Sequence, residues 1–402
     1  MEPRSVRVTA RILQGRTGGP GMNAIEKLKV LAPAMAFEPA EETSVRRQMS
    51  APCASRIKLS DSIHRAVMPG GKRIALLKTL LTSVCENNCN YCAFRQERDI
   101  RRVTFTPDEL ARAFIQLQKA GIAEGIFLSS GIAGGGVRIQ DRLVATAEIL
   151  RRRYEFGGYI HLKIMPGAEK DQIEAAMRLA DRVSVNLEAP SSDLLAQLAP
   201  QKTFKDGLLQ ELKWIEGIRR DTPGKWPSST TQFVVGAGTE SDLDLLVMTE
   251  YLQRETHLAR AYFSSFSPVP ETPLEFHSPS PPLREHRLYQ SSFLIRDYGF
   301  TVEELPFNDK GHLPLNRDPK LAWAEEHLTH SPVELNRVGR HELLRVPGIG
   351  PVGARRILHE RRRGLLRDLS DLHKLGISSP RAAPFILLDG HRPAQQLSFW
   401  PT

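Results

Sequence analysis

The chain has 402 residues, a net charge of +9 at neutral pH, and no apolar run close to the roughly 20 residues of a membrane span. Its composition is that of a globular protein, and its length suits two or three domains. It has four cysteines, three of them between residues 85 and 92. This usage excludes a disulfide framework and predicts a reducing, cytoplasmic location.

The N-terminal part of the chain, before the first predicted strand, contains little regular pattern. Residues 1–21 are rich in glycine and contain arginine, which predicts a disordered extension. Residues 22–73 begin with helical spacing and continue as a polar, irregular segment. Cys53 lies in this segment, far from Cys85 along the chain. The spacing is compatible with three roles for Cys53: a fourth thiolate ligand, a ligand for another group, or a packed side chain. We favour packing.

Three cysteines follow the first apolar strand, which we predict at residues 74–81. Cys85, Cys89 and Cys92 have the spacing C-x3-C-x2-C, and asparagines that tolerate turns lie between them. Such a loop can place three thiolates on three irons of a [4Fe–4S] cluster and leave the fourth iron for a non-protein ligand. Two alternatives remain at this point: structural zinc, which needs a fourth ligand, and three packed cysteines without a ligand.

Short apolar strands then alternate with helices. We predict strands at residues 74–81, 125–131, 159–164, 182–187, 231–235 and 261–266, a helix beginning with a capping box of Thr106 and Glu109, and another beginning near Asp141. Strands of this kind are parallel and buried on both faces. The predicted fold class is therefore α/β, a partial (β/α)6 TIM-like barrel over residues 74–300, with a doubly wound open sheet as the other solution. Both folds bind ligands at the carboxyl ends of the strands.

Polar or small residues occupy several of those strand ends. Small residues let a ligand approach the backbone, although a turn that needs glycine has the same appearance. Alternation places three polar side chains of the fourth strand on one face, where they contact a ligand or form a structural network. His161 and Lys163 share a face of the third strand. The candidate ligand-binding residues are Ser129, Ser130, Gly131, Ser184, Asn186, Glu188, Gly236, Gly238 and Phe266.

The cysteine motif, with Tyr91 before its last cysteine and Phe94 after it, resembles the signature of the radical S-adenosylmethionine (radical SAM) superfamily. The strand-end residues resemble the superfamily's contacts to the amino group, ribose, carboxylate and adenine of SAM, although the acid that usually ends the first of these motifs is absent after Gly131. The resemblance implies a [4Fe–4S] cluster, SAM, and an electron donor such as a flavodoxin or ferredoxin. It implies reductive cleavage of SAM to a 5′-deoxyadenosyl radical that abstracts a substrate hydrogen. No side chain is assigned as catalytic.

The C-terminal part of the chain is basic. Residues 331–402 contain twelve Lys/Arg and six Asp/Glu, a net charge of +6 that leaves +3 for the chain before Ser331. Within this part, two short amphipathic helices are joined by Pro347, Gly348, Ile349 and Gly350. This pattern resembles the helix-hairpin-helix module, and residues 372–386 resemble a degenerate second copy. Residues 301–330 are predicted to connect this domain to the barrel.

Glycines in such a hairpin expose backbone N–H groups that stabilise a phosphate. Arg355, Arg356 and the arginines at 361–363 add attraction that does not depend on base sequence. The other interpretation is that the hairpin only docks or packs.

The barrel, the helix at residues 284–290 and the terminal hairpin together resemble a bacterial family of radical SAM proteins labelled for DNA modification or repair. The resemblance implies a link to nucleic acid, which we interpret as a DNA substrate. Contacts to phosphates carry no base information, so we expect DNA to be bound with little sequence preference, and we expect no membrane partner. Two other functions remain: a radical SAM enzyme that modifies RNA, and a non-enzymatic iron–sulfur or zinc protein that binds DNA. The sequence gives no indication of oligomeric state.

Overall fold

The computed structural model describes residues 22–31, 63–67 and 71–393. Their contacts group them into two units. The barrel unit contains the described residues up to Glu240 together with Leu252–Ser280, and the C-terminal unit contains Ser241–Tyr251 and the described residues from Pro281 onward. The predicted extension at residues 1–21, and Cys53, lie outside the described residues.

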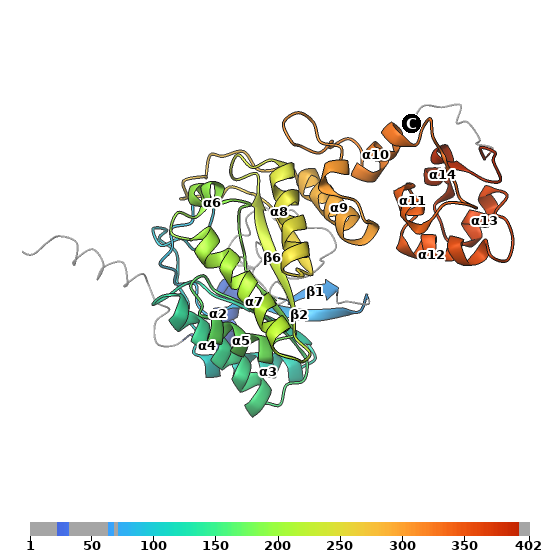
Figure 1. Ribbon diagram of the computed structural model, residues 1–402. Helices are drawn as coiled ribbons and strands as arrows, with labels where there is room; N and C mark the ends of the chain where they lie inside the picture. The colour runs from blue at the N-terminus through green and yellow to red at the C-terminus, as the bar shows by residue number, and fades with distance from the viewer. Residues whose placement is uncertain (1–21, 32–62, 68–70, 394–402) are drawn as a thin grey trace, which may run out of the picture. The chain divides into compact units, whose positions relative to one another are not determined.

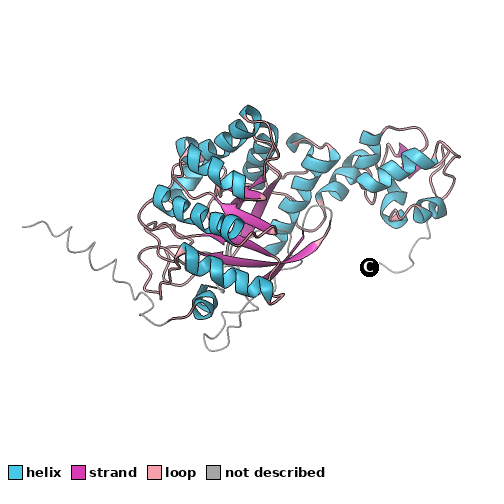
Figure 2. Cartoon of the chain, turned by 90° about the horizontal axis from the view of Figure 1, so that it is seen from below, coloured by secondary structure: helices cyan, strands magenta, loops and turns pink. Residues whose placement is uncertain are grey.

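The barrel unit is built on one curled seven-stranded sheet, seen in magenta in Figure 2. Its strands lie in chain order, with β1 antiparallel to β2 and every later pair parallel. The six parallel strands confirm the predicted partial barrel. The strands are β1 (Ile63–Val67), β2 (Arg73–Leu80), β3 (Gly125–Ser129), β4 (Tyr159–Lys163), β5 (Arg182–Ser184), β6 (Ser228–Val235) and β7 (Arg260–Ser265).

The strands bury almost all of their side chains, as expected of parallel strands covered on both faces. All five residues of β3 are buried, and so are four of the five in β4. The edge strand β1 is the exception, because only Ala66 among its five residues is buried. It lacks the apolar run by which the other strands were predicted, and the sequence analysis did not find it.

Helices follow the strands and surround the sheet (Figures 1 and 2). The predicted capping box at Thr106 and Glu109 is present at the start of α3. The helix α4 begins at Gly136, earlier than predicted, because Gly135, with φ of +86°, supplies the turn before it. The helices are α2 (Ala24–Leu31), α3 (Pro107–Lys119), α4 (Gly136–Glu148) with η4 (Ile149–Arg153), α5 (Lys170–Leu179), α6 (Ser192–Leu198), and η5 (Phe204–Leu208) with α7 (Leu209–Asp221). The helix α8 (Asp242–Glu255) is divided between the two units, with its residues up to Tyr251 in the C-terminal unit.

The C-terminal unit is helical and has its own apolar core, which includes Leu343, Ile349, Ile357, Leu372 and Ile377. The sequence analysis assigned residues 281–300 to the barrel, but this stretch, which forms α9, groups with the C-terminal unit. The elements are α9 (Pro282–Tyr298), η6 (Val302–Glu304), α10 (Pro319–His327), α11 (Arg340–Arg345), α12 (Pro351–Glu360), α13 (Leu369–Lys374), α14 (Ser379–Ala382), η7 (Ala383–Phe385) and the paired short strands β8 (Val333–Glu334) and β9 (Ile386–Leu387).

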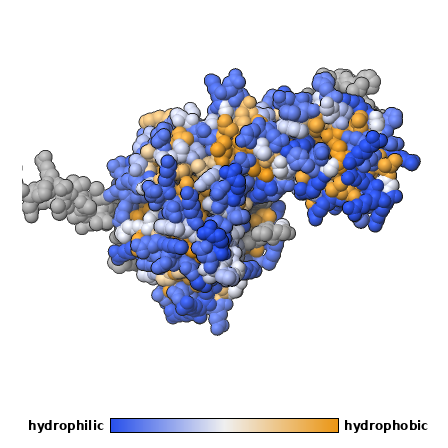
Figure 3. Space-filling view, in the orientation of Figure 1, coloured by the Kyte–Doolittle hydropathy of each residue, from blue (hydrophilic) through white to orange (hydrophobic). Residues whose placement is uncertain are grey.

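The described helices include none that is long and apolar enough to cross a membrane. On the face shown in Figure 3, hydrophilic residues predominate over the barrel unit, with smaller apolar groups between them.

Candidate cofactor site

One cavity opens at the carboxyl ends of the barrel strands. It encloses about 1140 Å³ of space, part of which is open solvent at its mouth. Residues at or beyond the ends of β2 to β7 line it, together with the loop that follows β2. The position agrees with the expectation that ligands bind at this edge of a parallel sheet.

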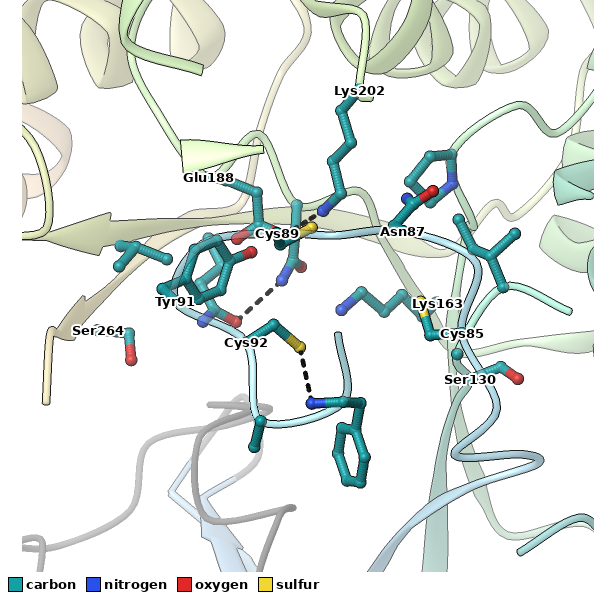
Figure 4. A pocket seen from close by; sticks show the side chains of 18 of the residues that line it. Cys85, Asn87, Cys89, Tyr91, Cys92, Ser130, Lys163, Glu188, Lys202 and Ser264 are labelled. Carbon is teal, nitrogen blue, oxygen red and sulfur yellow. Dashed lines mark hydrogen bonds and ion pairs between the residues drawn. The ribbon is translucent and has the colours of Figure 1, made fainter. Parts of the chain in front are cut away.

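All three cysteines of the predicted motif line this cavity (Figure 4). They are unpaired thiols; Cys89 is buried, and Cys85 and Cys92 are half-buried. Burial raises the pKa of Cys89, and burial followed by the charge of Cys89 raises the pKa of Cys92 to about 12. Three thiolates held together in this environment need a positive partner, and bound iron would supply it.

A buried arginine organises the cysteine loop. Arg102 Nη1 donates to the carbonyl oxygens of Ser83 and Phe94, each at 2.7 Å, and its Nη2 donates to those of Arg95 at 2.6 Å and Arg98 at 3.1 Å. One guanidinium therefore gathers four carbonyls from both sides of the three cysteines. The sequence analysis did not identify Arg102, because nothing in the local pattern distinguishes it from the neighbouring arginines.

Two other segments hold the loop from outside. The carboxylate of Glu86 accepts the N–H groups of Gly134 and Gly135 at 2.6 and 3.2 Å, which joins the loop to the start of α4. On the other side, Asn90 donates from its backbone to Leu198 at 2.8 Å and from its side chain to Gln197 at 2.7 Å. The loop is also bonded from Asn88 N–H to Gln201 Oε1, so it is fixed by residues as far as 113 positions away in the chain.

The donor set suits a cluster better than a single ion. Among the described residues, no group of three or more His, Cys, Asp or Glu side chains is arranged to hold one metal ion. Structural zinc takes four ligands around one point, whereas the thiolates of a [4Fe–4S] cluster bind separate irons. Three cysteines around an open cavity therefore fit a cluster with one iron left for another ligand.

Seven of the predicted SAM-binding residues line the cavity. Asn186 Nδ2 lies 3.2 Å from Gln232 Oε1, which holds the amide at the cavity wall. Ser130 Oγ is buried and has no hydrogen-bond partner within the described part of the chain, so a bound ligand could satisfy it. The seven residues are Tyr91, Phe94, Ser130, Gly131, Asn186, Glu188 and Phe266.

Four predicted residues lie outside the lining. The N–H groups of Gly236 and Gly238 donate to the carboxylate of Glu240, at 2.5 and 3.2 Å, so this turn is closed on itself. Ser129 and Ser184 belong to β3 and β5 and precede the residues that reach the cavity. Of the pair noted on β4, Lys163 lines the cavity, whereas His161 packs against Phe127 with ring centroids 4.6 Å apart.

The most informative residue that the sequence analysis missed is Lys202, in the loop after α6. Its Nζ lies 2.8 Å from Glu188 Oε1 inside the cavity. Burial is the largest single effect on the pKa of Lys202 and lowers it, but the charges of Glu188, Cys89 and Cys92 together raise it above its usual value, so the lysine is charged. Glu188 itself has φ of +64°, in the left-handed region, which ends the regular alternation of the strand.

The predicted hairpin residues lie in the C-terminal unit, where they connect α11 to α12. Gly348 has φ of +83°, and Lys320 Nζ donates to the Ile349 carbonyl at 2.6 Å. Arg355 and Arg356 are exposed on α12, but Arg356 also donates to the Leu375 carbonyl at 2.7 Å and so connects the two helix pairs. The other predicted residues of this turn are Pro347 and Gly350.

Comparison with known proteins decides the class of the barrel. Residues 79–245, which contain the cysteine loop and most of the cavity lining, match the model of the radical SAM superfamily. The chain carries a radical SAM domain. The cofactors of a radical SAM domain are a [4Fe–4S] cluster and SAM, and the cysteine loop and most of the cavity lining of this chain lie within the matched residues. No curated protein matches the sequence.

Solved structures similar to this chain include methylornithine synthase (18% identity, 56% of this chain and 63% of that chain, TM-score 0.44). They also include the FeFe-hydrogenase maturase HydG from Carboxydothermus hydrogenoformans (16%, 72% and 62%, TM-score 0.44). A third is the radical SAM methyltransferase TsrM from Kitasatospora setae (14%, 63% and 45%, TM-score 0.39). The chain covers less than two thirds of the length of each of these proteins, and no substrate is inferred for it from them.

Proposed function

We propose that this radical SAM enzyme cleaves SAM reductively and uses the resulting radical on DNA, in a modification or repair reaction. The main support for a DNA substrate is a pair of short helices joined by a glycine turn, which occurs twice in the basic C-terminal unit. The cofactor cavity in the barrel unit supports the radical chemistry. Single-stranded RNA is the competing substrate, and the experiment below includes it.

The residues of the cavity have separate tasks in this proposal. When bound, the cluster and SAM supply one electron, cleavage of the C5′–S bond and a 5′-deoxyadenosyl radical that abstracts hydrogen. Cys85, Cys89 and Cys92 would hold three irons. Asn186 and Ser130 would hydrogen-bond polar groups of SAM, while apolar lining such as Ile164, Met165 and Val234 keeps water away from the reacting atoms.

The C-terminal unit contains the same local structure twice. The pair α11–α12 turns at Gly348 and the pair α13–α14 turns at Gly376, with φ of +83° and +70°. An isoleucine follows each glycine and is buried in the common core, 1% and 3% exposed at Ile349 and Ile377. The matching conformations support the proposal that both pairs are helix-hairpin-helix motifs, the second with shorter helices.

The first turn also packs against the second. A Cβ at Gly348 would lie 2.7 Å from the carbonyl oxygen of Ser378, so glycine is required for this packing as well as for the turn. A substitution at Gly348 would therefore disturb the fold and DNA binding together. Exposed arginines on and after α12 offer a cleaner test, because their loss removes charge without removing core contacts.

The test uses full-length enzyme, reconstituted anaerobically. One variant replaces three exposed arginines of the C-terminal unit with alanine, and a control with the same net charge replaces three exposed arginines of the described barrel unit. DNA affinity is measured by fluorescence anisotropy against salt, and 5′-deoxyadenosine is assayed with and without duplex DNA. The variants are R355A/R362A/R363A and, as control, R152A/R220A/R254A.

The first variant is expected to weaken duplex binding about tenfold and to reduce the slope of log K against log salt by about 0.9 for each phosphate contact removed. The control should bind DNA like the wild type. Equal losses of DNA affinity in both variants would show that net charge causes the effect. The proposal that the hairpins bind DNA would then lose its support. Tighter binding of single-stranded RNA than of duplex DNA would favour an RNA substrate.

A further inference from the structure

Glu188 and Lys202 form a buried ion pair in the cavity, beside Tyr91 and Cys89. The side chains of Lys202 and Glu188 are only 10% and 4% exposed, and their charged atoms lie 2.8 Å apart. Figure 4 shows Lys202 extending toward both Glu188 and Cys89.

A buried ion pair contributes little to stability, because the attraction between the charges barely offsets their loss of hydration. Apolar residues of similar volume would serve the fold equally well. Charged pairs buried in a cavity are therefore candidates for a functional role.

The two charges lie beside the nearest cluster ligand. Lys202 and Glu188 line the cavity together with Cys89, and Lys202 extends toward Cys89 in Figure 4. We therefore expect the ammonium to act on the bound cluster more strongly than the carboxylate does, and with the opposite sign. The carboxylate holds the ammonium in place and also weakens its effect.

We propose that Lys202 and Glu188 set the reduction potential of the cluster that Cys89 binds. Reduction adds one negative charge to the cluster, and nearby charges and solvent exposure shift the potential of iron–sulfur centres. In a cavity of low polarity, an ammonium beside a ligand sulfur stabilises the reduced form more than it would in water. The proposal requires the bound cluster and does not depend on the nucleic-acid substrate.

The test is a set of charge changes in the full-length, reconstituted protein. K202M removes the cation, E188Q removes the anion, and the double variant removes both. K205M removes an exposed lysine a short way along the same stretch and is the matched control. Each protein is titrated anaerobically with dithionite in the absence of SAM, and the reduced cluster is followed by its paramagnetic resonance signal.

The expected midpoint potentials fall in a fixed order. E188Q should be the most positive, followed by the wild type and K205M together, then the double variant, then K202M. At a fixed potential near the midpoint, the ratio of reduced to oxidised cluster should differ about tenfold between wild type and K202M, which is about 59 mV for a one-electron couple.

A potential of K202M equal to that of K205M would overturn the proposal, as would a negative shift in E188Q. If K202M fails to retain iron, E188Q decides the question, because it keeps the ammonium: a positive shift supports the proposal and any other result overturns it. Loss of the cluster from both single variants would show that the pair only builds the loop.

Discussion

Glu211 is a buried carboxyl group on α7 that supports one wall of the cofactor cavity. Its side chain is almost fully buried, and its Oε1 accepts the N–H of Gly167 at 2.9 Å, next to the cavity residues Met165 and Pro166. Burial raises its pKa from 4.5 to about 7, against a smaller opposing effect of the Gly167 and Ala168 N–H groups. In the folded protein, Glu211 is therefore mainly protonated at pH values below about 7.

This shift predicts a pH-dependent stability. A carboxyl group whose pKa is raised on folding contributes stability below the unfolded pKa, and that contribution is lost as pH rises from 4.5 to about 7. E211Q keeps an acceptor for Gly167 and cannot ionise. At pH 8 it should exceed the wild type in stability by up to about 3 kcal/mol, and at pH 5 the two should be close. Thermal unfolding at both pH values measures this, and an equal difference at the two would contradict it.

At the scale of elements, the strand β5 and the residues after it deliver polar groups to the cavity. Its three polar residues were predicted to share one face, but Ser184 ends the strand outside the lining, whereas Asn186 and Glu188 reach the cavity. Position along this one segment therefore separates Ser184, which lies outside the lining, from Asn186 and Glu188, which line the cavity.

This arrangement gives a matched pair of substitutions. N186A removes an amide at the cavity wall and should weaken SAM binding by about 5- to 150-fold, because one hydrogen bond contributes roughly 1–3 kcal/mol. S184A should leave SAM affinity unchanged, and both variants should keep their iron. Calorimetric titration of the reconstituted proteins compares them, and similar affinities in the two would show that Asn186 does not contact SAM.

The sequence predicted the elements that depend on residues close together in the chain. The strands β2 and β3 contain apolar runs, and the capping box of Thr106 and Glu109 lies within a single helical turn. The residues that it did not predict depend on distant contacts. Arg102 is identified only by the carbonyls that converge on it, and Lys202 only because the loop after α6 folds back to Glu188. The edge strand β1 lacks an apolar run because little of it is buried.

At the scale of the whole molecule, the C-terminal unit takes a short stretch, Ser241–Tyr251, from within the sequence of the barrel. A buried ion pair secures this stretch. Asp242 is 1% exposed, its Oδ1 lies 2.6 Å from Arg284 Nε, and its Oδ2 accepts the Leu313 N–H at 2.9 Å. The unit is therefore not a simple appendage that begins at one residue.

Breaking this pair should destabilise the C-terminal unit. R284M leaves the Asp242 carboxylate buried without its cation, which costs about 3–5 kcal/mol. R254M, which breaks an exposed pair with Glu255, should cost less than about 1 kcal/mol. Unfolding followed by circular dichroism compares the two, and iron content should stay constant because the cysteine loop belongs to the barrel unit. Equal stability of the two variants would show that the pair does not hold the stretch.

The left-handed backbone of Glu188 has a consequence for the evolution of the enzyme. A glutamate with φ of +64° stores strain that glycine would relieve, and its carboxylate also requires a buried lysine as partner. A lineage selected only for stability would replace both residues, and E188G/K202M should melt at a higher temperature than the wild type. A higher melting temperature of this variant would show that the chain keeps a less stable arrangement here, as expected where selection for function outweighs selection for stability.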